Sequence, residues 1–218
     1  MSSQKWVVGL FVVVFAAVGV AQTGTEKVLK FYWERAQALV RAGNPNLAGL
    51  SYSYVATTYY KKYGDKGAIA SKDSTRVAYY YSFGNLDSSK VILAPKGSIP
   101  AIDLSYPTLF DSAYQLNFYP NDTGGPNIAI GFDSDSLHSG WPVGLVLLDR
   151  QLYFPAWLYL SYPEKKGFRR FSRSFRFTSR DGFIFPDSVW EVAAVDGILF
   201  STSYRLETGL KEIKVYRK

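Results

Sequence analysis

The sequence contains no cysteine, one methionine and one histidine in 218 residues. The lack of cysteine excludes disulfides, and it excludes the acylated cysteine through which lipid-anchored lipoproteins are held. A zinc site needs several His or Cys ligands, and His138 has none to join it. A serine triad would place His138 beside a nucleophile, but no Gly-x-Ser-x-Gly motif occurs. We therefore interpret His138 as an exposed loop residue and expect no catalytic residue, no metal and no cofactor.

The acidic motifs that support hydrolysis in other proteins are incomplete here. Asp122-Thr123-Gly124 matches the aspartic-protease tripeptide, but those enzymes bring two such carboxylates together and this chain has one copy. Its Pro, Asn and Gly neighbours are typical of a turn. Asp133, Asp135 and Asp149 leave open a carboxylate pair for glycoside hydrolysis or, for the first two, weak calcium binding. No full calcium loop follows, and we interpret all three as solvated loop acids.

Long hydrophobic runs are also scarce, and the one present stands near the first residue. Met1–Ala21 has Lys5 close to its beginning, an apolar stretch from Trp6 to Val20, and small residues before Gln22. This pattern predicts a secretory signal peptide at 1–21, followed by a single domain at 22–218. A retained anchor is the alternative, although the run is short for a membrane span. Export of a cysteine-free chain favours the bacterial periplasm or the cell exterior.

The charge balance is basic, with 25 Lys and Arg against 18 Asp and Glu. Removal of Lys5 with the signal leaves 24 basic residues against the 18 acids, a net charge near +6. A positive field favours anionic partners, including phospholipid surfaces. Because export makes nucleic acid an unexpected partner, we expect at most a transient contact with an anionic membrane surface.

Aromatic residues are abundant, with 17 Tyr, 15 Phe and 5 Trp. The segment after the signal predicts an amphipathic helix over Glu26–Arg41, since Thr23 and Glu26 have capping-box spacing and Gly43 with Pro45 ends the pattern. The apolar stripe of this helix comprises Val28, Leu29, Tyr32, Trp33, Ala36, Leu39 and Val40. A stripe this wide must cover an apolar surface, most simply the face of a sheet.

The rest of the chain predicts about ten antiparallel strands, joined mostly by hairpins. No helical pattern alternates with them, which excludes a parallel α/β sheet. Tight turns at Asp181-Gly182, Asp196-Gly197 and Thr208-Gly209 divide Gly167–Arg217 into four strands. The earlier strands are Leu50–Tyr60, Arg76–Phe83, Ala113–Tyr119, Ile128–Phe132, Val143–Leu148 and Trp157–Tyr162. Between them, Gly64–Ser74, Val91–Pro107 and Asp133–Gly140 are interpreted as loops, and the last two are candidate lids.

An export signal, the helix Glu26–Arg41 and a long antiparallel meander with a proline-rich interruption resemble the Lol-type periplasmic lipoprotein carriers. These include LolA, LolB and the outer-membrane lipoprotein-sorting proteins. The closing run, with Phe185-Pro186 and Asp196-Gly197, carries the resemblance as well. It implies a mainly β fold, an unclosed antiparallel β-barrel whose concave side is capped by helices and holds acyl chains. The carriers' functional arginine has no single match in this chain, so the likeness is one of fold.

Aromatic residues on both faces of several strands favour a cavity over plain core packing. Cavities that bind apolar ligands are lined mostly by hydrophobic and aromatic side chains, with a few polar groups. The candidate lining residues are Trp33, Tyr54, Tyr81, Leu116, Trp157, Trp190, Phe200 and Tyr204.

Arginines interleave with phenylalanines between residues 168 and 180. Arg169 and Arg173 fall on one face of the predicted strand and are candidates for binding an anionic head group, because guanidinium groups form paired hydrogen bonds with phosphate and carboxylate. The alternative is an amphipathic strand whose arginines extend to water beside an aromatic core.

These features predict an exported, non-enzymatic, monomeric binding protein that shelters a lipid or lipid-modified ligand under a helical lid, in outer-membrane lipid or lipoprotein trafficking. A small outer-membrane barrel with aromatic girdles is one alternative. The charged chain end, the proline-rich middle and the amphipathic helix argue against it. A surface module that binds glycans or proteins through exposed Tyr and Trp is the other alternative.

Overall fold

The computed structural model describes residues 25–64, 67–100, 104, 113–118, 125–134, 140–163, 165–196 and 201–216. Within these residues the chain forms a helix at 25–43 and ten strands. The strands are β1 (Ser51–Tyr63), β2 (Ile69–Ser82), β3 (Asn85–Leu93), β4 (Gln115–Phe118), β5 (Asn127–Asp133), β6 (Val143–Asp149), β7 (Pro155–Ser161), β8 (Arg170–Arg180), β9 (Phe183–Asp196) and β10 (Ser201–Tyr216). The predicted signal peptide, Asp122-Thr123-Gly124 and His138 lie outside the described residues.

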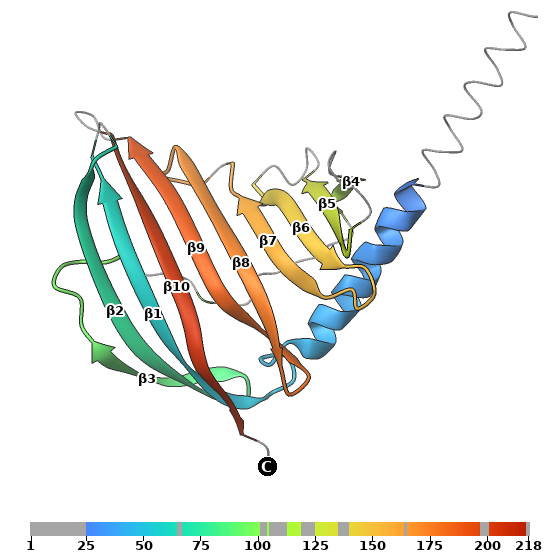
Figure 1. Cartoon of the computed structure of the whole chain (residues 1–218), viewed down its shortest axis with the longest axis horizontal. Helices are drawn as coiled ribbons and strands as arrows, with labels where there is room; N and C mark the ends of the chain where they lie inside the picture. The colour runs from blue at the N-terminus through green and yellow to red at the C-terminus, as the bar shows by residue number, and fades with distance from the viewer. Residues whose placement is uncertain are drawn as a thin grey trace, which may run out of the picture.

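All ten strands belong to one antiparallel sheet, in the order β3-β2-β1-β10-β9-β8-β7-β6-β5-β4. Consecutive strands pair with each other, except β3 and β4, and β1 also pairs with β10. The sheet stays open, with β3 and β4 at its edges. Figure 1 shows its twist and curvature, with the helix against the half formed by the shorter strands. The predicted mainly β, unclosed antiparallel architecture is confirmed.

The two faces of the sheet differ in composition. We call the face that packs against the helix the inner face and the opposite one the outer face. Strand alternation places Leu158 and Leu160 of β7 on the inner face, fully buried, and Trp157 and Tyr159 on the outer face, partly exposed. The buried inner-face residues of the neighbouring strands include Ile128, Ile130, Phe132, Val146, Leu148, Phe175 and Val189.

The helix covers part of this inner face, as its sequence pattern predicts. Leu29, Trp33, Ala36 and Val40 recur every three or four residues and are all buried. The ring of Trp33 lies 5.4 Å from that of Phe132 on β5. The helix ends at residue 43, a glycine whose missing side chain lets the backbone pass against Ile184 of β9, since a Cβ there would lie 2.7 Å from the Ile184 side chain.

Two hairpins use left-handed turn residues. Asp181 and Gly182 have φ of 52° and 84° and connect β8 to β9, which confirms the turn predicted there. Phe83 and Gly84 have φ of 51° and 79° and connect β2 to β3. A side chain at Gly84 would collide with the carbonyl of Asn46, so this glycine also lets the hairpin approach the segment after the helix.

Three expectations were wrong in detail. Thr208-Gly209 is not a turn: Gly209 lies inside β10, paired with Thr57 on β1, so the closing run has three strands instead of four. The predicted loop Gly64–Ser74 contains the beginning of β2, because polar side chains on an exposed strand do not prevent backbone pairing. Residues 91–93, expected in a loop, belong to the edge strand β3.

No helix within the described residues is both long enough and apolar enough to cross a membrane.

Candidate functional site

The inner face carries a buried ionic cluster, formed by Arg173 on β8, Glu191 on β9 and Tyr204 on β10. The register places Arg173 directly opposite Glu191, and Arg173 Nε donates to Glu191 Oε2 at 3.0 Å. The Tyr204 hydroxyl donates to Glu191 Oε1 at 3.0 Å. Only 2 % of the Glu191 side chain and 11 % of the Arg173 side chain are exposed. Glu191 therefore accepts from two strands and compensates a nearly buried guanidinium.

The tyrosine of this cluster is held in its neutral form. Burial, followed by the nearby charge of Glu191, raises the pKa of Tyr204 well above its ordinary value. Tyr204 thus stays a hydrogen-bond donor across the physiological pH range. Beside the cluster, the hydroxyls of Thr58 and Thr208 form a buried hydrogen bond of 2.8 Å between β1 and β10.

Apolar residues of the same face surround the ionic cluster. Leu160 lies opposite Arg173 on β7, and Leu206 lies next to Glu191 on β10. Both leucines are fully buried. Arg173 also lies 5.2 Å from the ring centre of Phe171, which allows a cation–π contact. The cluster is therefore a small polar site inside an apolar surface.

A second group on the inner face is aromatic and lies on β1 and β2. The rings of Tyr52 and Tyr81 stack at 4.4 Å with 7° between their planes, and the Tyr54 and Tyr81 hydroxyls are 3.2 Å apart. The Tyr52 hydroxyl donates to Asn46 Oδ1 at 2.6 Å. Burial, with a smaller contribution from Tyr81, raises the pKa of both Tyr52 and Tyr54 well above the usual range.

The side chain of Leu104 packs against this aromatic group from the segment that follows β3. The space left between them is about 20 Å³, and its lining also includes Phe185 and Leu210. That volume holds roughly one water molecule. In this conformation the aromatic end of the inner face is closed.

The structure separates the sequence-predicted residues into groups. Trp33 and Leu116 lie at the β4–β5 end, where Leu116 pairs opposite Phe132 and Trp33 packs on the same phenylalanine. Tyr54 and Tyr81 belong to the aromatic group, and Tyr204 and Arg173 to the ionic cluster.

The remaining candidates do not join them. Trp157 and Trp190 alternate with the buried Leu158 and Val189, so their side chains are on the outer face. Arg169 is exposed and precedes β8. Phe200 lies outside the described residues.

Sequence reasoning missed Glu191 and Leu104. The sequence could have indicated Glu191, because it alternates with the same period as the buried residues Val189 and Ala193 of β9. A carboxylate at a buried strand position requires a partner that compensates its charge. Leu104 follows a proline-rich run and has no local signal for its contact. Within the described residues, no group of three or more His, Cys, Asp and Glu side chains comes together that could hold a metal ion.

No family model matches the chain, and no curated protein matches its sequence. Solved structures do match. An outer-membrane lipoprotein-sorting protein domain from Vibrio parahaemolyticus has 11% identity and a TM-score of 0.41, covering 87% of this chain and 93% of the other. A LolA superfamily protein from Nitrosomonas europaea has 10% identity and a TM-score of 0.37, covering 84% and 94%. A DUF1329 family protein from Desulfovibrio piger has 9% identity and a TM-score of 0.42, covering 86% and 92%.

The lipoprotein-sorting and LolA-type proteins that the sequence resembles are thus among the solved structures that match this chain. Because these identities and TM-scores are low, function has to be argued from the residues of this chain.

Proposed function

We propose that this chain is an exported, non-enzymatic binding protein that shelters a lipid or lipid-modified ligand against the inner face of its sheet. The observation that carries the proposal is the presence on one face of both an extended apolar wall and a buried ionic cluster. An amphiphile has the same two parts. Its tail would lie along the apolar wall, and its polar head would exchange hydrogen bonds with Arg173, Glu191 and Tyr204.

The energetics favour the tail as the main source of affinity. Each buried methylene contributes about 0.8 kcal/mol, so a sixteen-carbon chain would contribute on the order of 10 kcal/mol before ordering costs. The polar head contributes less, because the cluster already satisfies its own charges. We expect it to select the head group and to set the orientation of the ligand.

Binding requires an opening, because the closed space beneath Leu104 is water-sized. We propose that the segment after β3 acts as the lid and that an acyl chain enters when Leu104 leaves Tyr54 and Tyr81. Leu104 is the side chain that packs on the aromatic group among the described residues of this segment, and exposing one leucine costs less than burying an acyl chain gains.

Native mass spectrometry of the protein, purified without detergent, tests the function. We expect adducts of lipid mass that solvent extraction removes, and a single mass without adducts after repeated preparations would contradict the proposal. A fluorescent long-chain fatty acid then tests the lid. Leu104→Asp should release the probe faster, whereas Leu152→Asp, at a leucine that is 67% exposed in the β6–β7 turn, should release it at the wild-type rate.

We also propose that the protein contacts anionic membranes transiently through the exposed side of the helix. Val28 and Phe31 are each 45% exposed there, beside Lys27, Lys30 and Arg35. Exposed apolar side chains flanked by cations are typical of interfacial binding. Vesicles containing phosphatidylglycerol should retain the protein at low salt and release it at high salt, and Phe31→Ser should weaken retention. Equal retention by neutral vesicles would contradict the charge dependence. A monomer is expected in both states, which light scattering checks.

A further inference from the structure

A second pocket lies where β1, β2, β3 and β10 meet. Its volume is about 410 Å³, within the range of small-ligand sites. The lining residues are Ser51, Tyr52, Tyr80, Tyr81, Ser82, Asp87, Ser88 and Tyr216. Among these described residues there are aromatic rings, hydroxyls and one carboxylate, with no lysine or arginine. This composition does not suit an anionic head group.

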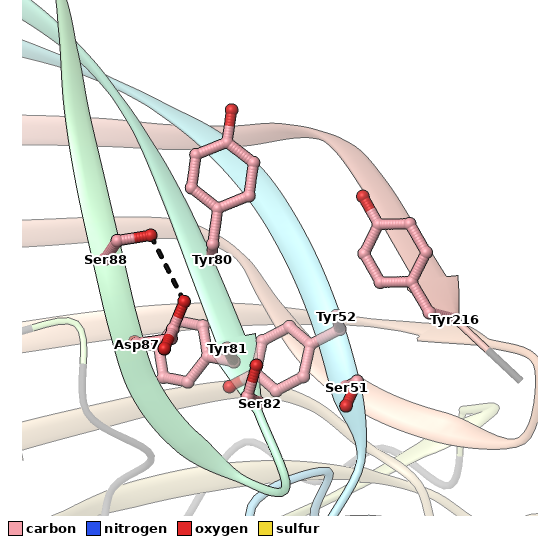
Figure 2. Close-up of a pocket in the computed structure, with 8 residues that line it drawn as sticks. All are labelled: Ser51, Tyr52, Tyr80, Tyr81, Ser82, Asp87, Ser88 and Tyr216. Carbon is pink, nitrogen blue, oxygen red and sulfur yellow. Dashed lines mark hydrogen bonds between the residues drawn. The ribbon is translucent and has the colours of Figure 1, made fainter. Parts of the chain in front are cut away.

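Two exposed tyrosine rings stand on the same side of this pocket. Tyr80 projects from β2 and Tyr216 from β10, with β1 passing between them, as Figure 2 shows. Their exposed fractions are 40% and 50%. The Tyr216 hydroxyl and the Ser53 hydroxyl are 2.9 Å apart, which fixes the Tyr216 ring across β1. Two ring faces are thus available to a ligand without an ordering cost for Tyr216.

The hydrogen-bonding groups of the pocket are mainly hydroxyls, with one strong acceptor. Asp87 lies at a bulge, where β3 has one residue more than β2 between the pairs Tyr80–Ser88 and Tyr81–Leu86. Ser88 Oγ lies 3.4 Å from Asp87 Oδ2, a long contact that leaves the carboxylate with acceptor capacity. The hydroxyls of Ser51, Ser82 and Ser88 can both donate and accept.

From this combination we infer that the pocket binds a neutral carbohydrate. The polarised C–H faces of a sugar ring pack on the negative faces of aromatic rings. Its vicinal hydroxyls donate to a carboxylate, which accepts at two oxygens, and exchange hydrogen bonds with the serines. Tyr80, Ser88 and Tyr216 lie on the outer face and belong to this pocket alone, whereas Tyr52 and Tyr81 also border the inner-face space beneath Leu104. The inference therefore does not rest on the proposed function.

Titration calorimetry with maltotriose, cellotriose and chitotriose tests the inference on the full chain. We expect at least one of the three to bind at millimolar concentration or below. Tyr80→Ala and Tyr216→Ala should each weaken that binding by about threefold to tenfold, and Asp87→Asn by about tenfold. Tyr80→Phe keeps the ring and should keep most of the affinity.

The matched control is Tyr59→Ala, at a tyrosine that is 57% exposed on the outer face of β1 and outside the pocket. It should bind the sugar as the wild type does. Failure of all three sugars to bind, binding that these pocket variants do not change, or binding of phosphocholine alone would overturn the inference. Fatty-acid binding by Tyr80→Ala should equal that of the wild type, so the carbohydrate site and the lipid site can fail separately.

Discussion

Strands β8 and β9 carry two arginine–carboxylate pairs with similar shortest distances on opposite faces of the sheet. Arg173 and Glu191 meet on the inner face at 3.0 Å, and Arg176 and Asp187 meet on the outer face at 2.8 Å. The exposed fractions differ widely, at 11% and 2% for the inner side chains and 58% and 27% for the outer ones. The distance between arginine nitrogen and carboxylate oxygen is therefore nearly the same in the two pairs, while their exposure to solvent differs.

Burial determines how much each ion pair contributes to the stability of the fold. Water and dissolved ions screen the outer pair, and holding two flexible side chains in place offsets part of the attraction. The inner pair has lost most of its hydration, so each charge depends on the other and on Tyr204. An inner pair of this kind is costly to break but does not by itself make the fold more stable than a hydrophobic pair would.

The largest expected effect comes from breaking the inner pair. Glu191→Ala leaves the Arg173 guanidinium buried without its carboxylate, and we expect the free energy of unfolding to fall by about 3–5 kcal/mol. Urea unfolding followed by circular dichroism measures this. Glu191→Gln should lose less, because the amide oxygen still accepts from Tyr204. A loss below about 1 kcal/mol for Glu191→Ala would contradict this expectation, because ion pairs on the protein surface contribute that little.

Replacing both partners separates structural and binding roles. The variant Arg173→Met/Glu191→Leu/Tyr204→Phe removes both charges and the hydroxyl that donates to Glu191, so its unfolding free energy should equal or exceed that of the wild type. If the cluster recognises a head group, this stable variant should still bind long-chain alcohols and lose its preference for charged amphiphiles. Unchanged preference would exclude the cluster from recognition.

A second comparison concerns hydroxyl pairs. Thr58 and Thr208 are buried on the inner face, whereas Ser53 and Tyr216 form a hydroxyl pair on the outer face. Thr208→Val leaves the Thr58 hydroxyl without this partner, and the unfolding free energy should fall by about 1–3 kcal/mol. Ser53→Ala, with Tyr216 half exposed to water, should change it by less than about 1 kcal/mol. Equal losses in the two variants would show that the faces do not differ in solvation.

The same alternation that defines the faces made most strands predictable. β1, β5, β6 and β7 combine apolar residues in a period of two with clear ends, and their predicted bounds lie within a few residues of those in the structure. β3 has no such period, because all nine of its residues are exposed at the sheet edge. Gly209 shows the converse error, since a glycine inside a strand has the same local signature as a turn glycine.

The candidate site was predictable only in part. Large apolar residues occupy both faces of β7, so alternation separates Trp157 from Leu158 but does not tell which of them faces the helix. The ionic cluster joins three strands, and its Tyr204 depends on the β9–β10 register. The pairing of β1 with β10 joins residues 150 positions apart, such as Thr58 and Thr208, and no local pattern records it.

Alkaline pH tests the inner tyrosines. Because burial raises the folded-state pKa of Tyr54 above its ordinary value of 10.0, the folded state retains a proton that the unfolded state loses. This contribution to stability is complete below about pH 10 and is lost as the pH rises from there toward the folded-state pKa. Tyr54→Phe should lower the unfolding free energy by about 1 kcal/mol at pH 7, and its unfolding free energy should decline less steeply above pH 10 than that of the wild type. Tyr59→Phe, on the outer face of the same strand, is the control and should follow the wild-type curve.

The smallest effect is expected from the outer pair. Burial of Asp187 raises its pKa, but hydrogen bonds from Arg176 and Ser188 lower it by more, so the net shift is downward. The pair therefore stabilises the fold above the ordinary Asp pKa near 4, and this contribution is lost as the pH falls through the lowered value. Arg176→Ala should reduce the unfolding free energy at pH 7 by less than about 1 kcal/mol, and by less still in molar salt. A loss as large as that of Glu191→Ala would mean that burial does not determine what these two pairs contribute to stability.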